Sequence, residues 1–116
     1  MKRDMDLIRQ LLLVTESDGK IQFESNHSQE EIADHVQMLI EERLVEGKTV
    51  RNHIGVLCGY HITRLTMRGH DFLDAARSPK IWNAAKDKIQ KEGVGWTLKI
   101  LYGLLEQYAK SHFPVQ

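Results

Sequence analysis

Cysteine is nearly absent from this sequence, since Cys58 is the only one among 116 residues, and no disulfide can form within the chain. A chain without disulfides is typical of a reducing compartment, which predicts a cytoplasmic location. Long apolar runs are also absent. None approaches the roughly 20 residues that a membrane-spanning helix needs, so we expect no membrane partner. The opening stretch MKRDMDLIRQLLLV is basic at its start, but acidic residues interrupt its apolar patch and no small-residue cleavage site follows. This pattern predicts a helix and not a signal peptide.

Signatures of catalysis are lacking as well. The chain contains no glycine-rich phosphate loop, no paired-carboxylate motif and no nucleophile elbow. We therefore expect a non-enzymatic protein with no cofactor and no small-molecule substrate. The adjacent His70 and Asp71 could suggest acid–base chemistry, but we interpret them as a packing and hydrogen-bonding element. Cys58 lies among apolar residues of a predicted strand, which favours a buried thiol over a reactive one.

The six histidines raise the question of a metal site. Glu31 and His35 are four residues apart in a predicted helix, and His27 lies just before it. A zinc site normally needs three or four ligands, with cysteine or histidine dominant. One helical pair does not meet that requirement, so we expect no metal and place His35 at the surface or boundary of its helix.

The formal net charge is zero, but the charges are unevenly distributed. Residues 1–20 carry four positive and four negative side chains, and residues 21–46 carry one positive and seven negative. Residues 47–116 carry eleven positive and five negative, so the three sums are 0, −6 and +6. Opposed charge in one chain allows it to pair with itself, or to present one part to a partner. Two solvated faces are the simpler interpretation.

The first half of the chain has clear boundary signals. Apolar spacing predicts a helix over residues 2–16, followed by a short strand over residues 21–23. A second helix, over residues 28–44, begins at a capping box in which Ser28 is the N-cap and Glu31 returns the hydrogen bond. Its apolar stripe predicts an outer face, whose residues are Glu30, Ala33, Asp34, Gln37 and Glu41.

A hairpin and three further helices follow. LVEGKTVR and GYHITRLT read as the two strands, with a turn between Val50 and Gly59 that alternation alone does not locate. Thr66 is positioned to cap a helix with Met67, Phe72, Leu73 and Ala76 as its buried face, and Gly69 indicates a close approach in its first turn. Ser78-Pro79 begins a helix that ends at Glu92-Gly93, with Ile81, Trp82, Ala85 and Ile89 as its apolar positions. The last helix covers residues 95–111.

This order of elements predicts an α+β, mostly α, winged-helix-like domain: helix, short strand, helix, β-hairpin wing and helix, with two C-terminal helices. We expect one domain over residues 1–116. Within it, residues 1–77 form the winged-helix core and residues 78–116 form a helical pair.

Several motifs resemble a known family. They are the opening MKRDMDLIR, the Glu-Glu-Ile-x-x-His core and Glu-x-Leu-Val-Glu-Gly exit of the second helix, and, most specifically, Arg64-Leu65-Thr66-x-x-Gly69-His70-Asp71-Phe72-Leu73-Asp74. With Trp82 and its following lysines, they make the whole chain similar to the bacterial and phage proteins catalogued as domain of unknown function 2513. The resemblance implies a winged-helix-like fold and a link to prophage or mobile-element genes. It implies no activity and no functional residues.

Duplex DNA is the partner that a winged helix suggests first. The helix before the wing usually enters the major groove, and most of the affinity comes from cations that neutralise phosphates. Here that helix carries several carboxylates, so we expect contact mainly through the wing and its flanks. The candidate DNA-binding residues are Lys2, Arg3, Gln37, Lys48, Arg51, His53, Arg64 and Arg68.

The last helix is apolar around most of its circumference and must bury most of it. We therefore expect a homodimer through the first and last helices. The candidate interface residues are Trp96, Leu98, Leu101, Tyr102 and Leu105. The other interpretation is that neighbouring helices of the same chain cover this helix completely.

Two functions follow from these observations. The favoured one is a DNA-associated transcription regulator of prophage or mobile-element type. The alternative is a protein–protein interaction module, a homodimeric adaptor that keeps the fold without binding DNA. In that case the acidic second helix meets a basic protein partner, or the basic part of another copy.

Overall fold

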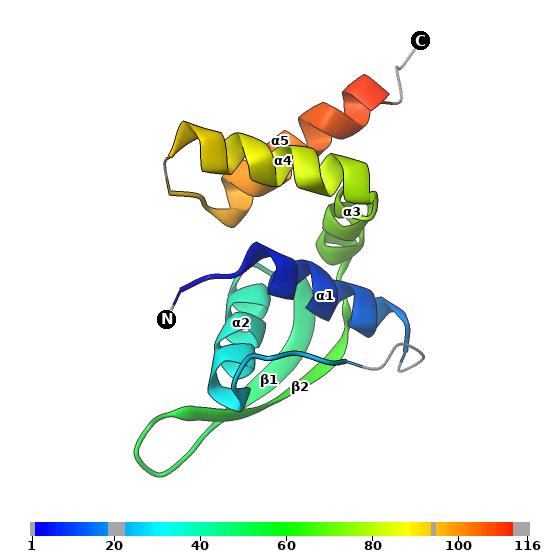
Figure 1. Cartoon of the computed structure of the whole chain (residues 1–116). Helices are drawn as coiled ribbons and strands as arrows, with labels where there is room; N and C mark the ends of the chain where they lie inside the picture. Colours follow the sequence, from blue (N-terminus) through cyan, green and yellow to red (C-terminus); the bar gives the residue numbers. More distant parts are fainter. Residues whose placement is uncertain (1, 19–22, 94, 113–116) are drawn as a thin grey trace. The chain divides into compact units, whose positions relative to one another are not determined.

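A computed structural model describes residues 2–18, 23–93 and 95–112 of the chain. The elements, in order, are α1 (Met5–Glu16), α2 (Gln29–Glu41), β1 (Val45–Arg51), β2 (Leu57–Leu65), α3 (Met67–Ala76), α4 (Pro79–Glu92) and α5 (Leu98–His112). The fold is α+β and mostly helical, and the β-hairpin that follows α2 makes it winged-helix-like, as expected (Figure 1). The short strand expected over residues 21–23 falls partly on residues 21 and 22, which lie outside the described residues.

The chain divides into two compact units, residues 1–70 and residues 71–116. The division falls inside α3, whereas we expected one domain with an internal boundary after residue 77. The sequence marks the end of α3 clearly, but it carries no local signal for a division within a continuous helix.

Helix caps in the first unit come from single side chains. Asp4 begins α1, because its Oδ1 accepts hydrogen bonds from the backbone N–H groups of Asp6 (2.9 Å) and Leu7 (3.2 Å). The helix therefore begins three residues later than expected. The predicted cap of α2 is confirmed, since the Glu31 N–H donates to Ser28 Oγ at 3.1 Å. The Glu31 carboxylate accepts from the Ser28 hydroxyl (3.3 Å) rather than from its backbone.

The hairpin is antiparallel, and its turn lies at residues 52–56. Asn52 forms this turn, because its Oδ1 accepts from the N–H groups of both Ile54 and Val56 at 3.0 Å. Gly55 supplies a left-handed φ of 89°, which other residues rarely adopt. The turn therefore lies within the interval from Val50 to Gly59 that the sequence indicated, and the second strand begins at Leu57.

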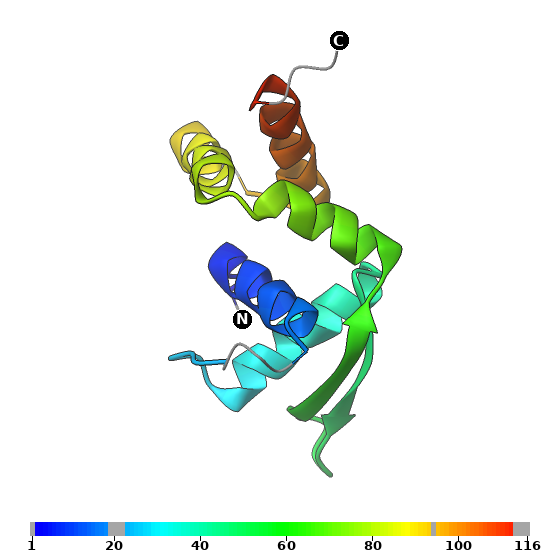
Figure 2. The same ribbon diagram turned by 90° about the vertical axis from the view of Figure 1, so that its right-hand side faces the viewer.

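Helices α1 and α2 lie on the same side of the hairpin (Figure 2). They bury an apolar core together with residues of the hairpin, formed by Leu7, Ile8, Leu11, Leu12, Ile32, Ala33, Val36, Leu39, Leu44, Val45, Leu57 and Leu65. Ala33 is fully buried, so its predicted place on the outer face of α2 is wrong. It lies three residues before Val36, on the same side of the helix.

Leu44 and Gly69 meet where the hairpin joins α3. Arg43 adopts a left-handed φ of 62° and ends α2, and the Leu44 N–H then bonds to Leu39 O at 2.9 Å. The Leu44 carbonyl accepts from the Thr66 N–H at 3.0 Å. Thr66 caps α3 as predicted, with its Oγ1 accepting from the Gly69 N–H at 3.0 Å. A Cβ on Gly69 would lie 1.9 Å from Leu44 O, so this position requires glycine.

The second unit consists of the end of α3 with α4 and α5. The predicted boundaries of α4 are confirmed: Ser78 Oγ accepts from the Ile81 N–H, and Gly93 ends the helix with a φ of 65°. All four apolar positions predicted for α4 are buried. On its surface, the hydrogen bond and charge of Glu92 raise the pKa of Lys88, and Lys88 lowers the pKa of Glu92.

Two expectations about α3 and α5 need correction. Met67 was placed on the buried face of α3, but 78% of it is exposed, because it is the first residue of the helix and precedes the packed turn. Helix α5 begins at Leu98 rather than at residue 95, since Thr97 Oγ1 accepts from the Ile100 N–H at 3.1 Å and acts as its cap.

Candidate nucleic-acid interface

The hairpin is the most strongly cationic part of the first unit. Residues 47–63 contain Lys48, Arg51, His53 and His61 and no aspartate or glutamate, and all four side chains are exposed. Lys48 stands directly opposite His61 in the strand register. The tip extends beyond the ends of α1 and α2 (Figure 1). An approaching polyanion would therefore meet positive groups in a segment that carries no carboxylate.

Two of the other predicted DNA contacts are held by acidic partners. Arg64 forms a bidentate pair with Glu46, with Nε–Oε2 and Nη2–Oε1 distances of 3.1 and 2.8 Å. Arg68 lies 3.8 Å from a carboxylate oxygen of Glu42. Each pair cancels one positive charge, so phosphate would have to compete with a carboxylate for these guanidinium groups. Sequence spacing did not show this, because the partners are 18 and 26 residues away.

Gln37, the predicted base reader, has a structural role. Its Oε1 accepts from the Thr49 hydroxyl at 2.6 Å, and its Nε2 donates to Glu41 at 3.2 Å. The first bond connects α2 to β1, and the second lies within α2. The side chain would have to break both to read a base.

Lys2 and Arg3 lie apart from the hairpin. Both are exposed, but Lys2 shares a surface pocket with Ser28, Glu30, Glu31 and Asp34 at the start of α2. Of the eight predicted residues, Lys48, Arg51 and His53 therefore remain as exposed cations of the hairpin segment that lacks carboxylates.

Helix α2 itself is acidic. It contains four carboxylates, Glu30, Glu31, Asp34 and Glu41, and no lysine or arginine. Three of the four are exposed and Asp34 is half-buried. This helix would repel a polyanion along its length.

A polar cluster that the sequence analysis missed lies between α1 and α2, formed by Asp4, Ser25, His27, Glu31 and His35. His35 is fully buried, so its predicted surface position is wrong. Its Nε2 accepts from the Asp4 N–H at 2.9 Å, which leaves the proton on Nδ1 to donate to Glu31 O at 2.7 Å. The His27 ring bridges two side chains: its Nδ1 lies 2.6 Å from Ser25 Oγ, and its Nε2 lies 2.9 Å from Asp4 Oδ2.

The ring nitrogens of both histidines are thus occupied by protein groups. Among the described residues, no group of three or more His, Cys, Asp or Glu side chains could hold a metal ion. In the sequence, the feature that could have indicated this cluster is Asp4, because aspartate is a common N-cap residue and it stands immediately before the apolar pattern of α1.

Two further interpretations of single residues are wrong. Cys58 is exposed on β2, because the strand begins at Leu57 and the thiol lies on the side away from the helices, 3.5 Å from Val50 O. His70 is exposed too, and its ring makes no hydrogen bond to any described residue, because it lies on the outer side of α3.

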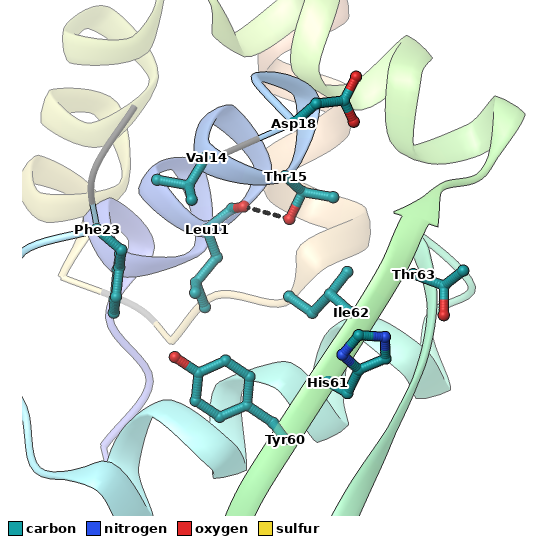
Figure 3. Close-up of a pocket in the computed structure, with 9 residues that line it drawn as sticks. All are labelled: Leu11, Val14, Thr15, Asp18, Phe23, Tyr60, His61, Ile62 and Thr63. Atoms are coloured by element: carbon teal, nitrogen blue, oxygen red, sulfur yellow. Dashed lines mark hydrogen bonds between the residues drawn. The ribbon is translucent and has the colours of Figure 1, made fainter. Parts of the chain in front are cut away.

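A cavity of about 330 Å³ lies between α1 and β2 in the first unit (Figure 3). Its walls are mostly apolar, and the hydrogen bond among them joins Thr15 Oγ1 to Leu11 O within α1 at 2.7 Å. Asp18, Tyr60 and His61 are its titratable groups, and no hydrogen bond links any two of them. The described walls therefore hold no acid–base or nucleophile pair.

The residues predicted to face a partner chain on α5 are mostly enclosed. Leu101 and Leu105 have no exposed surface and Leu98 is 9% exposed. These three therefore cannot form the predicted interface, since they are already buried within the chain. Trp96 and Tyr102 are half-buried, and Ile100, which lies outside the predicted set, is 49% exposed.

No helix in the described ranges is long and apolar enough to cross a membrane.

Comparisons with known proteins agree with the resemblance seen in the sequence. A family described as "Hypothetical protein (DUF2513)" matches residues 2–95. An uncharacterized protein of Haemophilus influenzae (strain ATCC 51907 / DSM 11121 / KW20 / Rd) is 30% identical over 110 residues, covering 84% of this chain and 86% of that protein. No solved structure matches.

Proposed function

The chain belongs to the DUF2513 family, and we propose that it is a non-enzymatic, DNA-associated regulator of prophage or mobile-element type that contacts duplex DNA mainly through its hairpin. The observation that carries the proposal is the hairpin segment 47–63, which has exposed cations and no carboxylate. Phosphate neutralisation supplies most of the affinity in non-specific DNA binding. This segment offers positive charge without a carboxylate of its own.

The acidic α2 sets the direction of approach. If α2 entered the major groove, as the helix before a wing usually does, it would bring its carboxylates against the phosphates. Approach by the hairpin tip keeps α2 farther from the backbone. If Lys48, Arg51 and one or two further cations contact phosphates, the logarithm of the binding constant should fall linearly as the logarithm of the salt concentration rises. The expected slope is roughly −2 to −4.

The test is a salt series on random-sequence duplex DNA, followed by fluorescence anisotropy. We expect the wild type to bind at low salt. The double variant Lys48→Glu/Arg51→Glu should lose measurable binding, because two phosphate contacts become repulsive. Circular dichroism should show an unchanged fold, since both side chains are exposed.

A matched control is Lys80→Glu/Lys99→Glu. It makes the same change in net charge at exposed positions in the first turns of α4 and α5, where an acidic residue suits the helix dipole. The control should bind close to wild type. Absence of wild-type binding even at low salt, or equal loss in both variants, would count against a hairpin-led interface.

The acidic α2 favours one alternative, a protein–protein interaction module. Its carboxylates would meet a basic protein partner, or the hairpin of a second copy. That alternative predicts that the chain does not bind DNA. It also predicts self-association, or binding to a basic protein, and either interaction should weaken as salt is raised. Light scattering at micromolar concentration over the same salt series measures the self-association. A monomer at every salt concentration would argue against the homodimeric form.

A further inference from the structure

Ile54 occupies an unusual position for a large apolar side chain. It lies in the turn of the hairpin and is 71% exposed, with Arg51 and His53 close to it in the chain. Val50, at the end of β1, is 51% exposed. Single exposed apolar residues are common on protein surfaces, but this one stands at the tip of the cationic segment proposed above to meet DNA.

The turn holds Ile54 in a fixed outward position. Asn52 accepts hydrogen bonds from the N–H groups on both sides of Gly55, and the Gly55 N–H bonds back to Asn52 O at 3.0 Å. The Asn52 N–H also donates to Val56 O at 2.9 Å. Arg51 adds a bond from Nη1 to Gly55 O at 2.7 Å, which keeps its guanidinium beside the tip. The apolar side chain and the cation are thus presented together, with little ordering left to occur on binding.

From this arrangement we propose that Ile54 is an apolar wedge that enters the minor groove of duplex DNA and separates two stacked base pairs. The inference rests on the proposed function, because it assigns the way in which the same hairpin holds DNA. Arg51 contacts the phosphates or the floor of the groove beside the wedge. Proteins that bind in the minor groove frequently insert an apolar side chain between base steps, which unstacks them and kinks the duplex.

The small number of apolar side chains at the tip favours DNA over a lipid surface. Ile54 and Val50 are the exposed large apolar residues of the hairpin, and two side chains bury little area in a bilayer compared with an amphipathic helix. A wedge between base pairs needs only one. The cations beside it match the strong negative potential of the groove.

The experiment uses a short duplex with 2-aminopurine beside TA steps, which unstack easily. The fluorescence of 2-aminopurine rises when it is unstacked. We expect the wild-type chain to produce this rise, Ile54→Leu to keep it, and Ile54→Gln to lose it while its salt slope in anisotropy is unchanged. The Ile54 N–H bond to Asn52 involves only backbone on the Ile54 side, so the turn should persist in both variants.

Met67→Gln is the matched control, because Met67 is 78% exposed but lies beyond the opposite end of β2. It should keep the fluorescence rise. If the wild type binds DNA with a normal salt slope and gives no rise, the wedge is wrong and the proposed function stands. If the wild type binds no DNA, both are wrong. Binding to phosphatidylserine vesicles that Ile54→Gln abolishes, without any unstacking of DNA, would assign the tip to lipid and overturn the wedge.

Discussion

Replacing Gly69 with alanine should lower the free energy of unfolding by about 3 kcal/mol or more. The new Cβ would lie 1.9 Å from Leu44 O and 2.9 Å from Leu44 C, and these are backbone atoms that no rotamer change can move. Relief requires α3 to move away from the end of α2. That movement would weaken the bond from the Thr66 N–H to Leu44 O, which holds the base of the hairpin to the helix.

Chemical denaturation followed by circular dichroism measures the loss, and hydrogen exchange locates it. Faster exchange should appear in the amides around Leu44 and Thr66. Gly103→Ala is a matched control, since Gly103 is also helical and a Cβ there would meet nothing within 4 Å. That control should stabilise the chain by roughly 0.5–1 kcal/mol. Equal effects of the two substitutions would show that the contact at Gly69 has no energetic consequence.

His35→Leu should cost about 3 kcal/mol, although leucine is similar in size and more apolar. The substitution removes the acceptor of the Asp4 N–H, and a buried donor without a partner costs roughly 1–3 kcal/mol. It also removes the bond to Glu31 O and replaces a planar ring with a branched side chain in a packed site. Because Asp4 caps α1, the start of that helix should loosen as well.

Thermal and urea unfolding give the size of this effect, and exchange of the Asp6 and Leu7 amides shows whether the α1 cap is lost. His70→Leu provides the control, since the His70 ring is exposed and bonds to no described residue, and it should change stability by less than about 0.5 kcal/mol. His35→Gln keeps a donor and an acceptor and should lose less than His35→Leu. An unchanged stability in His35→Leu would contradict the structural role of the cluster.

Local signals predicted much of this fold. The caps at Ser28, Thr66 and Ser78 and the stop at Gly93 each depend on bonds to residues within three or four positions. The apolar positions of α4 follow from helical spacing alone. The close approach at Gly69 was also predicted, although its partner Leu44 could not be named from the sequence.

Long-range partners account for most of what could not be predicted. His35 is buried because Asp4, 31 positions earlier, supplies a donor to its ring. Gln37 is occupied by Thr49, and Arg64 by Glu46, so neither presents its polar group freely to a ligand. Lys48, Arg51 and His53 could be identified because the order of the predicted elements places them in the hairpin wing. The strand register decides which of these cations is paired, because it places Arg64 opposite Glu46 and leaves Lys48 and Arg51 exposed.

The exposed Cys58 affects how an oligomer of this protein has to be measured. Its thiol is the single sulfhydryl of the chain and lies on the outside of the hairpin, so air oxidation can join two molecules through one covalent bond. Such a product would have the mass of a dimer while holding two cationic hairpins against each other. Masses determined with and without reductant distinguish it from a non-covalent pair. The same thiol accepts a maleimide dye at one defined place, close to the surface proposed to contact DNA.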